Sequence, residues 1–150
     1  MGDVAAVFRM DLGAFDLLLP ASDFSGLAVL PGSGDIPARG DFKGRKYELL
    51  LLDPALEGLF GLEPCTAGSE AVAFLAAGRD ESPRAFVSRR AFEIGAVPLR
   101  DFRLPPRGIK ASLARRGLMA FRFATGQRFQ ILLDPGALAS GLRGEKGAGP

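Results

Sequence analysis

The chain has 150 residues, 47% of them hydrophobic, with 19 basic and 17 acidic residues and a formal net charge of +2. It has no histidine and a single cysteine, Cys65, which excludes histidine-based catalysis, histidine metal ligands, a disulfide framework and a cysteine-based metal site. No apolar run approaches the length of a membrane span, and the first residues do not resemble a secretory signal. We therefore expect a cytoplasmic protein of one domain, or of two small halves sharing a core.

Short apolar segments separated by turn residues predict strands along most of the chain. The 20 glycines and 11 prolines are spread out, which favours many short strands over long helices. The predicted strands are residues 4–10, 14–19, 21–30 (after an initial bend), 40–53, 71–77, 84–88, 92–97, 118–124 and 128–133. Residues 31–39, 63–70 and 99–108 are predicted as loops or connectors, 109–116 as either strand or helix, and 54–60 and 135–141 as short helices.

Two similar phrases suggest that the chain consists of two related halves. Residues 47–56 read YELLLLDPAL and residues 129–138 read FQILLDPGAL. Each predicts a buried strand that turns at Leu-Asp-Pro into a short helix, where Asp53 or Asp134 can accept backbone N–H bonds and proline suits the first helical turn. Chance is the alternative explanation, because Leu-Leu-Asp-Pro is a common sequence.

The leucines of these phrases are the strongest candidates for the core. Strand alternation should turn one of Leu50 and Leu51, and one of Leu132 and Leu133, inward, and a run of four leucines suggests burial on both faces. With nine or ten short strands and short helices after Asp53 and Asp134, the predicted class is all-β, arranged as barrels or as a sandwich.

The charges are distributed unevenly along the sequence. Residues 1–83 carry 6 basic and 13 acidic residues, a net charge of −7, whereas residues 84–128 carry 11 basic and 2 acidic residues, a net charge of +9. Such asymmetry favours an acidic partner, a nucleic acid or head-to-tail contact with another protein. The simpler alternative is two solvated faces of one globular protein.

The order of these elements resembles the CheW-like adaptor domain of bacterial chemotaxis. The matching blocks are an opening hairpin with an aromatic-Leu-Gly phrase (8–13, then Phe15 and 17–20), Gly40 followed at the family's spacing by Arg45 and by a strand ending in Asp53, a looser block at 85–94, and a final block at 118–138. The chain departs from the family pattern at Lys46 (usually Gly), Leu50 (usually Pro) and Ser88 (usually Asp). These departures affect the receptor-contact surface more than the fold.

The resemblance implies an all-β domain at 1–143, made of two intertwined five-stranded SH3-like barrels that share a core, with a disordered tail at 144–150. It implies a non-catalytic adaptor without a cofactor that couples chemoreceptors to a CheA-type histidine kinase. The expected partners are the kinase regulatory domain and the cytoplasmic tip of the receptor, with self-association as a further option, and neither specific nucleic-acid binding nor membrane insertion is expected.

The candidate partner-binding residues are Arg45, Lys43, Lys46 and Phe24. The resemblance places Arg45 near the receptor-binding groove, where its guanidinium could pair bidentately with a carboxylate. The alternative role for Arg45 is to brace its own loop by pairing with Asp41.

Two other classes of function stay open at this stage. A nucleic-acid-binding β-barrel could use the basic 84–128 segment, but it needs exposed aromatic residues, for which Phe92, Phe102 and Phe129 are the candidates. An enzyme could use the strand-end carboxylates of Asp53 and Asp134, although capping of turns explains both more simply. Residues 23–26 (DFSG) match half of the signature of a PilZ-type cyclic-dinucleotide receptor, without the paired arginines that precede it.

Overall fold

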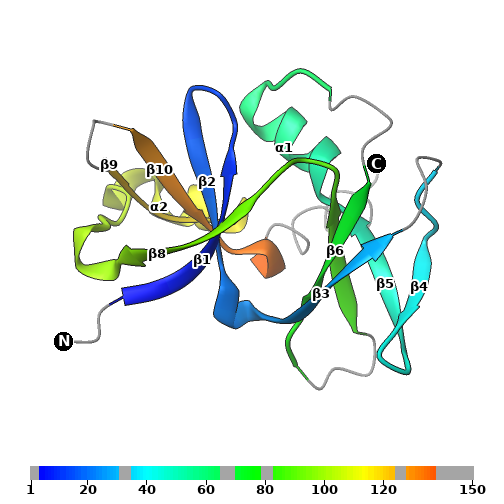
Figure 1. Ribbon diagram of the computed structural model, residues 1–150. Helices are drawn as coiled ribbons and strands as arrows, with labels where there is room; N and C mark the ends of the chain where they lie inside the picture. Colours follow the sequence, from blue (N-terminus) through cyan, green and yellow to red (C-terminus); the bar gives the residue numbers. More distant parts are fainter. Residues whose placement is uncertain (1–3, 31–34, 65–69, 79–82, 124–127, 138–150) are drawn as a thin grey trace. The chain divides into compact units, whose positions relative to one another are not determined.

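The computed structural model describes residues 4–30, 35–64, 70–78, 83–123 and 128–137. The chain divides into two compact units, which we call unit 1 (residues 1–21 and 91–150) and unit 2 (residues 22–90). Unit 2 is thus inserted between two segments of unit 1. Each unit is built on one five-stranded sheet, and Figure 1 labels the strands except β7.

Unit 1 contains the two ends of the described chain. Its elements are β1 (Val4–Asp11), β2 (Phe15–Pro20), β8 (Glu93–Pro98), the 3-10 helix η2 (Leu99–Asp101), α2 (Arg107–Arg115), β9 (Leu118–Phe123) and β10 (Phe129–Leu133). The strand order in the sheet is β8-β1-β2-β10-β9. Neighbouring strands are antiparallel except β2 and β10, which are parallel.

Unit 2 is one continuous stretch of chain. The 3-10 helix η1 (Ala21–Asp23) leads into it, followed by β3 (Phe24–Leu30), β4 (Arg39–Phe42), β5 (Arg45–Leu51), α1 (Leu52–Phe60), β6 (Ala71–Ala76) and β7 (Arg84–Ser88). The strand order is β3-β6-β7-β5-β4. Here too one neighbouring pair, β5 and β7, is parallel and the others are antiparallel.

The two strand orders are equivalent, position by position. In each sheet an edge strand is followed by a pair of antiparallel strands, then by a parallel neighbour and its hairpin partner at the other edge. The parallel neighbour is β10 in unit 1 and β5 in unit 2, and these are the strands that carry the two similar sequence phrases. The topology therefore agrees with the prediction of two related halves.

Each sheet is also linked from edge to edge. In unit 2, Lys43 Nζ, at the turn between β4 and β5, donates a hydrogen bond of 3.1 Å to the carbonyl oxygen of Ser25 in the opposite edge strand β3. In unit 1, Arg103 forms an isolated antiparallel bridge with Phe121 of the edge strand β9, shortly after the chain leaves the other edge at β8. The fold prediction is confirmed as a mostly-β protein of two five-stranded mixed sheets with short helices, and the shared core stays a prediction.

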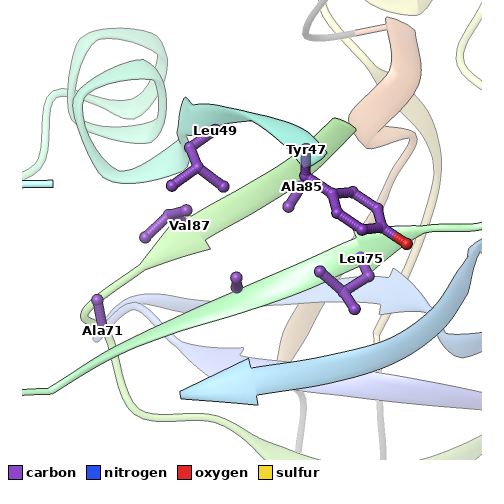
Figure 2. Close-up of a cluster of buried hydrophobic side chains, with 7 residues drawn as sticks. Tyr47, Leu49, Ala71, Leu75, Ala85 and Val87 are labelled. Atoms are coloured by element: carbon purple, nitrogen blue, oxygen red, sulfur yellow. The ribbon is translucent and has the colours of Figure 1, made fainter. Parts of the chain in front are cut away.

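Both units have an apolar core of their own. In unit 2, Tyr47, Leu49, Ala71, Ala73, Leu75, Ala85 and Val87 form a buried cluster, and Figure 2 shows how its side chains come from the adjacent strands β5, β6 and β7. In unit 1 the corresponding cluster consists of Val7, Leu18, Val97, Ala120 and Leu132, against which Phe102 packs.

The leucine predictions hold for one phrase and need correction for the other. Leu132 and Leu133 are both buried. In the first phrase the buried leucines are Leu49 and Leu52, whereas Leu50 is half-buried and Leu51 is 44% exposed. The four-leucine run was therefore wrongly expected to be buried on both faces. Leu50 lies on the face opposite to that of Leu49 and is half-buried, and Leu51 is exposed where β5 ends and α1 begins.

Some predicted boundaries also differ from the structure. The segment 40–53 is a hairpin of two strands, and α1 begins at Leu52 instead of after Asp53, although it ends as predicted before Gly61, whose φ of 65° provides a left-handed C-cap. The ambiguous segment 109–116 is largely helical, in α2, and the predicted loop before it contains η2.

The ends of several predictions lie outside the described residues. The helix expected after Asp134 begins at Pro135 and is described as far as Ala137. The Thr125-Gly126-Gln127 turn and the 144–150 tail are not among the described residues. No helix in the described part of the chain is long and apolar enough to cross a membrane.

Candidate partner-binding site

The β4–β5 hairpin carries three of the four predicted site residues. Its two-residue turn is Lys43-Gly44, with φ angles of 52° and 75°, and Lys43 is the one non-glycine residue with positive φ in the described part of the chain. Positive φ at both turn positions matches the right-handed twist of a hairpin, but it is strained for a lysine. The lysine ammonium reaches Ser25 O, so this strained conformation is held by a contact to β3.

Arg45 is exposed at the start of β5, and its guanidinium lies over a buried ring. The Arg45 Cζ atom is 5.8 Å from the centroid of Tyr47, whose side chain is 2% exposed and which packs in turn against Phe42 at 5.8 Å between centroids. A cation over an aromatic face contributes about 0.5–1 kcal/mol at an exposed site. The guanidinium is thus oriented by the unit 2 core at an exposed position on β5.

The strand register argues against Asp41 as the brace for Arg45. Arg45 is paired with Phe42 across the hairpin, and Asp41 is paired with Lys46. Because directly opposed residues lie on the same face of a sheet and successive residues alternate, Asp41 and Lys46 share the face opposite that of Arg45. The hairpin therefore carries one cation on each face near its turn, Arg45 over Tyr47 and Lys46 beside Asp41.

Phe24 lies in a different setting from the three cations. It begins β3, is half-buried, and packs against Phe74 and Phe86 at centroid distances of 5.7 Å and 6.3 Å. The contact between Lys43 and Ser25 brings the hairpin turn next to the residue that follows Phe24. The structure thus places Phe24 near Lys43 with part of its ring already in the core, and its role in binding stays a prediction.

The strand-end carboxylates of the enzyme hypothesis are engaged in structural hydrogen bonds. Asp53 accepts from Ser88 Oγ at 2.6 Å and from the backbone N–H of Arg89 at 2.8 Å, and Asp134 accepts from the N–H groups of Gly136 and Ala137. Asp134 caps the following helix as predicted, whereas Asp53 ties α1 to the end of β7. Ser88 suits this position, because a carboxylate there would repel Asp53.

Unit 1 contains a buried ion cluster that the sequence did not reveal. The Asp16 side chain, 1% exposed on β2, accepts hydrogen bonds from Arg128 Nε (3.0 Å), Gln130 Nε2 (2.9 Å) and Arg9 Nη1 (3.3 Å). Burial favours the neutral acid, but these three donors outweigh it and hold the pKa of Asp16 below its ordinary value. The signal in the sequence was an aspartate inside the apolar strand FDLLL, whose partners are far away in the chain.

The exposed carboxylate of Asp11 completes this cluster. It accepts from the backbone N–H of Gly13 at 2.9 Å and from Arg128, and these two bonds lower the pKa of Asp11. The hydrogen bonds to Asp16 and Asp11 in turn raise the pKa of Arg128. Arg128 also donates to the carbonyl oxygen of Gly13 at 2.8 Å. The cluster therefore joins the β1–β2 turn to the start of β10.

No protein-family model and no curated protein matches the sequence. Among solved structures, the scaffolding protein TtCheW from Thermoanaerobacter tengcongensis is similar, with a TM-score of 0.59 and 10% sequence identity over 87% of this chain and 84% of that chain. The chain has a CheW-like fold. The structural comparison thus confirms the resemblance read from the sequence at the level of the fold.

The two units of the CheW-like fold differ less in net charge than the two sequence segments 1–83 and 84–128 do. Counted by unit, unit 1 has 11 basic and 7 acidic residues, net +4, and unit 2 has 8 basic and 10 acidic residues, net −2. The strand topology brings residues of the basic 84–128 stretch into contact with acidic residues of the N-terminal half. Arg128 forms ion pairs with Asp11 and Asp16, and Arg90 forms one with Glu57 at 3.4 Å. The contrast of −7 and +9 along the sequence is therefore reduced to −2 and +4 when the charges are counted by unit.

Proposed function

We propose that this protein is a non-catalytic scaffold of the cytoplasm that couples chemoreceptors to a CheA-type histidine kinase. The CheW-like fold supports the proposal, since a solved protein with this fold is a scaffolding protein. Residues 1–143 would act as one adaptor domain made of two intertwined halves. The partners would be the receptor cytoplasmic tip and the kinase regulatory domain.

The β4–β5 hairpin is the proposed partner-binding site, with Arg45 as its principal residue and Lys43, Lys46 and Phe24 beside it. The observation that carries this assignment is the placement of Arg45, an exposed guanidinium seated on a buried tyrosine. A pre-oriented planar donor loses little conformational entropy when it pairs bidentately with a carboxylate or with the carbonyl groups at the end of a partner helix. Lys46 places a second charge on the other face of the same hairpin.

Replacing Arg45 by alanine should weaken partner binding while leaving the protein folded. Because the guanidinium is exposed, its loss should lower the free energy of unfolding by about 1 kcal/mol or less. Calorimetry with a receptor cytoplasmic fragment and with a kinase regulatory domain should show at least one affinity falling roughly tenfold, the effect of losing about 1.4 kcal/mol of binding energy.

Arg39→Ala is the matched control for this experiment, since Arg39 is exposed at the other end of the same hairpin, opposite Glu48. The double variant Arg45→Ala, Lys46→Ala shows whether the neighbouring charge compensates for the loss of Arg45. A folded Arg45→Ala protein, and a folded double variant, that bind both partners as strongly as the wild type would remove Arg45 from the interface.

The alternative of a nucleic-acid-binding barrel is disfavoured by the positions of its three candidate aromatic residues. Phe92 packs edge-on against Phe8 at 5.7 Å, Phe129 contacts two other phenylalanines, and Phe102 packs on the unit 1 core under Arg122. These rings are engaged within the protein and do not form a free stacking platform.

We therefore expect no oligonucleotide binding that survives physiological salt. Fluorescence anisotropy with single- and double-stranded oligonucleotides should show weak attraction at low salt that disappears at about 0.15 M, because exposed charges are screened there. Sub-micromolar binding that persists at that salt concentration would instead support the nucleic-acid function.

A further inference from the structure

A second charged surface lies on unit 1 and is not part of the hairpin site. The segment 99–116, here called the basic segment, contains η2 and α2 and carries six cationic side chains against one acidic one, Asp101. The six are Arg100, Arg103, Arg107, Lys110, Arg115 and Arg116, all of them exposed. In Figure 1 the segment follows β8 and leads into β9.

The six cations of the basic segment form no ion pairs with described acidic side chains, unlike three arginines that flank the segment in the sequence. Arg90, Arg122 and Arg128 are at least partly buried and form ion pairs with Glu57, Asp101 and Asp16 respectively. None of the six cations of the basic segment forms an ion pair with another described residue. The one acidic side chain in the segment is itself taken by Arg122, so the segment keeps its positive charge.

The charges of α2 are also unfavourable for the helix itself, because its N-terminal turn is basic. Its first turn contains Arg107 and Lys110 and no acidic residue, and the N-cap Pro106 makes no side-chain capping bond. Cations are unfavourable at a helix N-terminus, where the backbone N–H groups already carry partial positive charge. An acidic partner at this end would satisfy the side-chain cations and the helix dipole together.

The side chains between these cations distinguish among anionic partners. Leu113 alone in α2 is less than fully exposed, and helical spacing puts Gly108, Ala111, Ser112 and Ala114 among the basic residues on the rest of its surface. These small residues allow a partner backbone to approach closely. Ile109 is the one large apolar side chain exposed on α2, whereas an amphipathic helix that enters a bilayer carries a whole apolar face, which favours a protein partner over a lipid surface.

We propose that the basic segment is a docking surface for an acidic segment of a partner protein, with α2 as its centre. The surface belongs to unit 1 and uses none of the hairpin residues, so it adds a second binding site to the proposed scaffold. Exposed Leu99, Leu104 and Ile109 supply apolar contacts beside the cations, as in protein interfaces that surround an apolar centre with charge.

The test compares two double variants of the full-length protein that each remove two cations. Arg107→Ala, Lys110→Ala acts on α2, and Arg39→Ala, Arg84→Ala acts on unit 2, outside the proposed hairpin site residues, as the matched control. Alanine favours helix formation, so the α2 variant should melt at the same temperature as the wild type or higher. The probe is a helical Glu/Ala peptide, with a Lys/Ala peptide of the same length as the negative control.

We expect the Glu/Ala peptide to bind the wild type at about 0.15 M salt and to lose roughly tenfold in affinity for the α2 variant, while the unit 2 variant binds like the wild type. Absence of measurable binding to the wild type, or an equal loss in both variants, would overturn the proposal. So would tighter α2-dependent binding to phosphatidylserine-containing vesicles or to a double-stranded oligonucleotide, which would identify a membrane or a nucleic acid as the occupant. None of these results depends on the receptor and kinase experiments.

Discussion

Replacing Leu133 by alanine should lower the free energy of unfolding by about 2–5 kcal/mol, the range measured when a fully buried leucine leaves a cavity. Leu133 is 0% exposed at the end of β10, and it is followed by Asp134, which caps the next helix. The surrounding backbone is therefore fixed on both sides, and the site has little freedom to collapse around the missing side chain. Urea unfolding followed by circular dichroism would measure the change.

Leu51→Ala is the control for this measurement. Leu51 has the same chemistry and precedes the equivalent Leu-Asp-Pro turn, but it is 44% exposed. Its replacement should cost about 1 kcal/mol or less, because little apolar surface returns to water. Equal losses in the two variants would contradict the assignment of Leu133 to the core.

The second large effect is expected at Asp16. The change Asp16→Asn keeps the shape of the side chain and removes the charge that Arg128 and Arg9 contact. Breaking a buried ion pair costs about 3–5 kcal/mol, and we expect a loss near 3 kcal/mol because both arginines are about one-third exposed and can be hydrated. Asp11→Asn, in which the replaced carboxylate is 66% exposed, should cost much less than Asp16→Asn, because exposed ion pairs contribute little to stability.

The contribution of the Asp16 charge to the free energy of unfolding should also decrease at acidic pH. Because the pKa of Asp16 is lowered in the folded protein, its contribution is fully present above the unfolded value of about 4 and is lost as the pH falls through the folded value. The difference in unfolding free energy between wild type and Asp16→Asn should therefore be constant near neutrality and shrink below about pH 4. A difference that stays the same down to pH 2 would show that the charge of Asp16 is not what stabilises the fold.

Local patterns in the sequence predicted most strands of this fold. The segment 84–88 was predicted with the bounds that β7 has, because an apolar run between Pro83 and a polar stretch leaves little choice. The two Leu-Asp-Pro phrases indicated related halves, and they lie on the equivalent strands β5 and β10. The α2 segment stayed ambiguous because Ile109 and Leu113 are four residues apart, a helical spacing, in a short stretch that also contains glycine and serine.

The candidate site was harder to predict because its geometry depends on strand register. The sequence offered Asp41 as a local partner for Arg45, and only the pairing across the hairpin shows that the two lie on opposite faces. The Asp16 cluster could not be predicted at all, because Arg128 is 112 residues away in the sequence. Hydrophobic patterns in the sequence indicate which residues face inward. Ion pairs between segments that are distant in the sequence can be predicted only when the strand topology is known.

The insertion of unit 2 into unit 1 sets an order of events during synthesis. Strand β2 emerges early, but its parallel neighbour β10 begins at Phe129, after the whole of unit 2 has been made. At about 5–20 residues per second, the 112 residues between Asp16 and Arg128 correspond to a wait of roughly 6–22 s. During that time β2 carries an unpaired edge and a carboxylate without its principal arginine, while residues 22–90 are complete and able to fold. The nascent chain should therefore finish its inner unit first, and the exposed β1–β2 hairpin is the segment that a chaperone would have to protect.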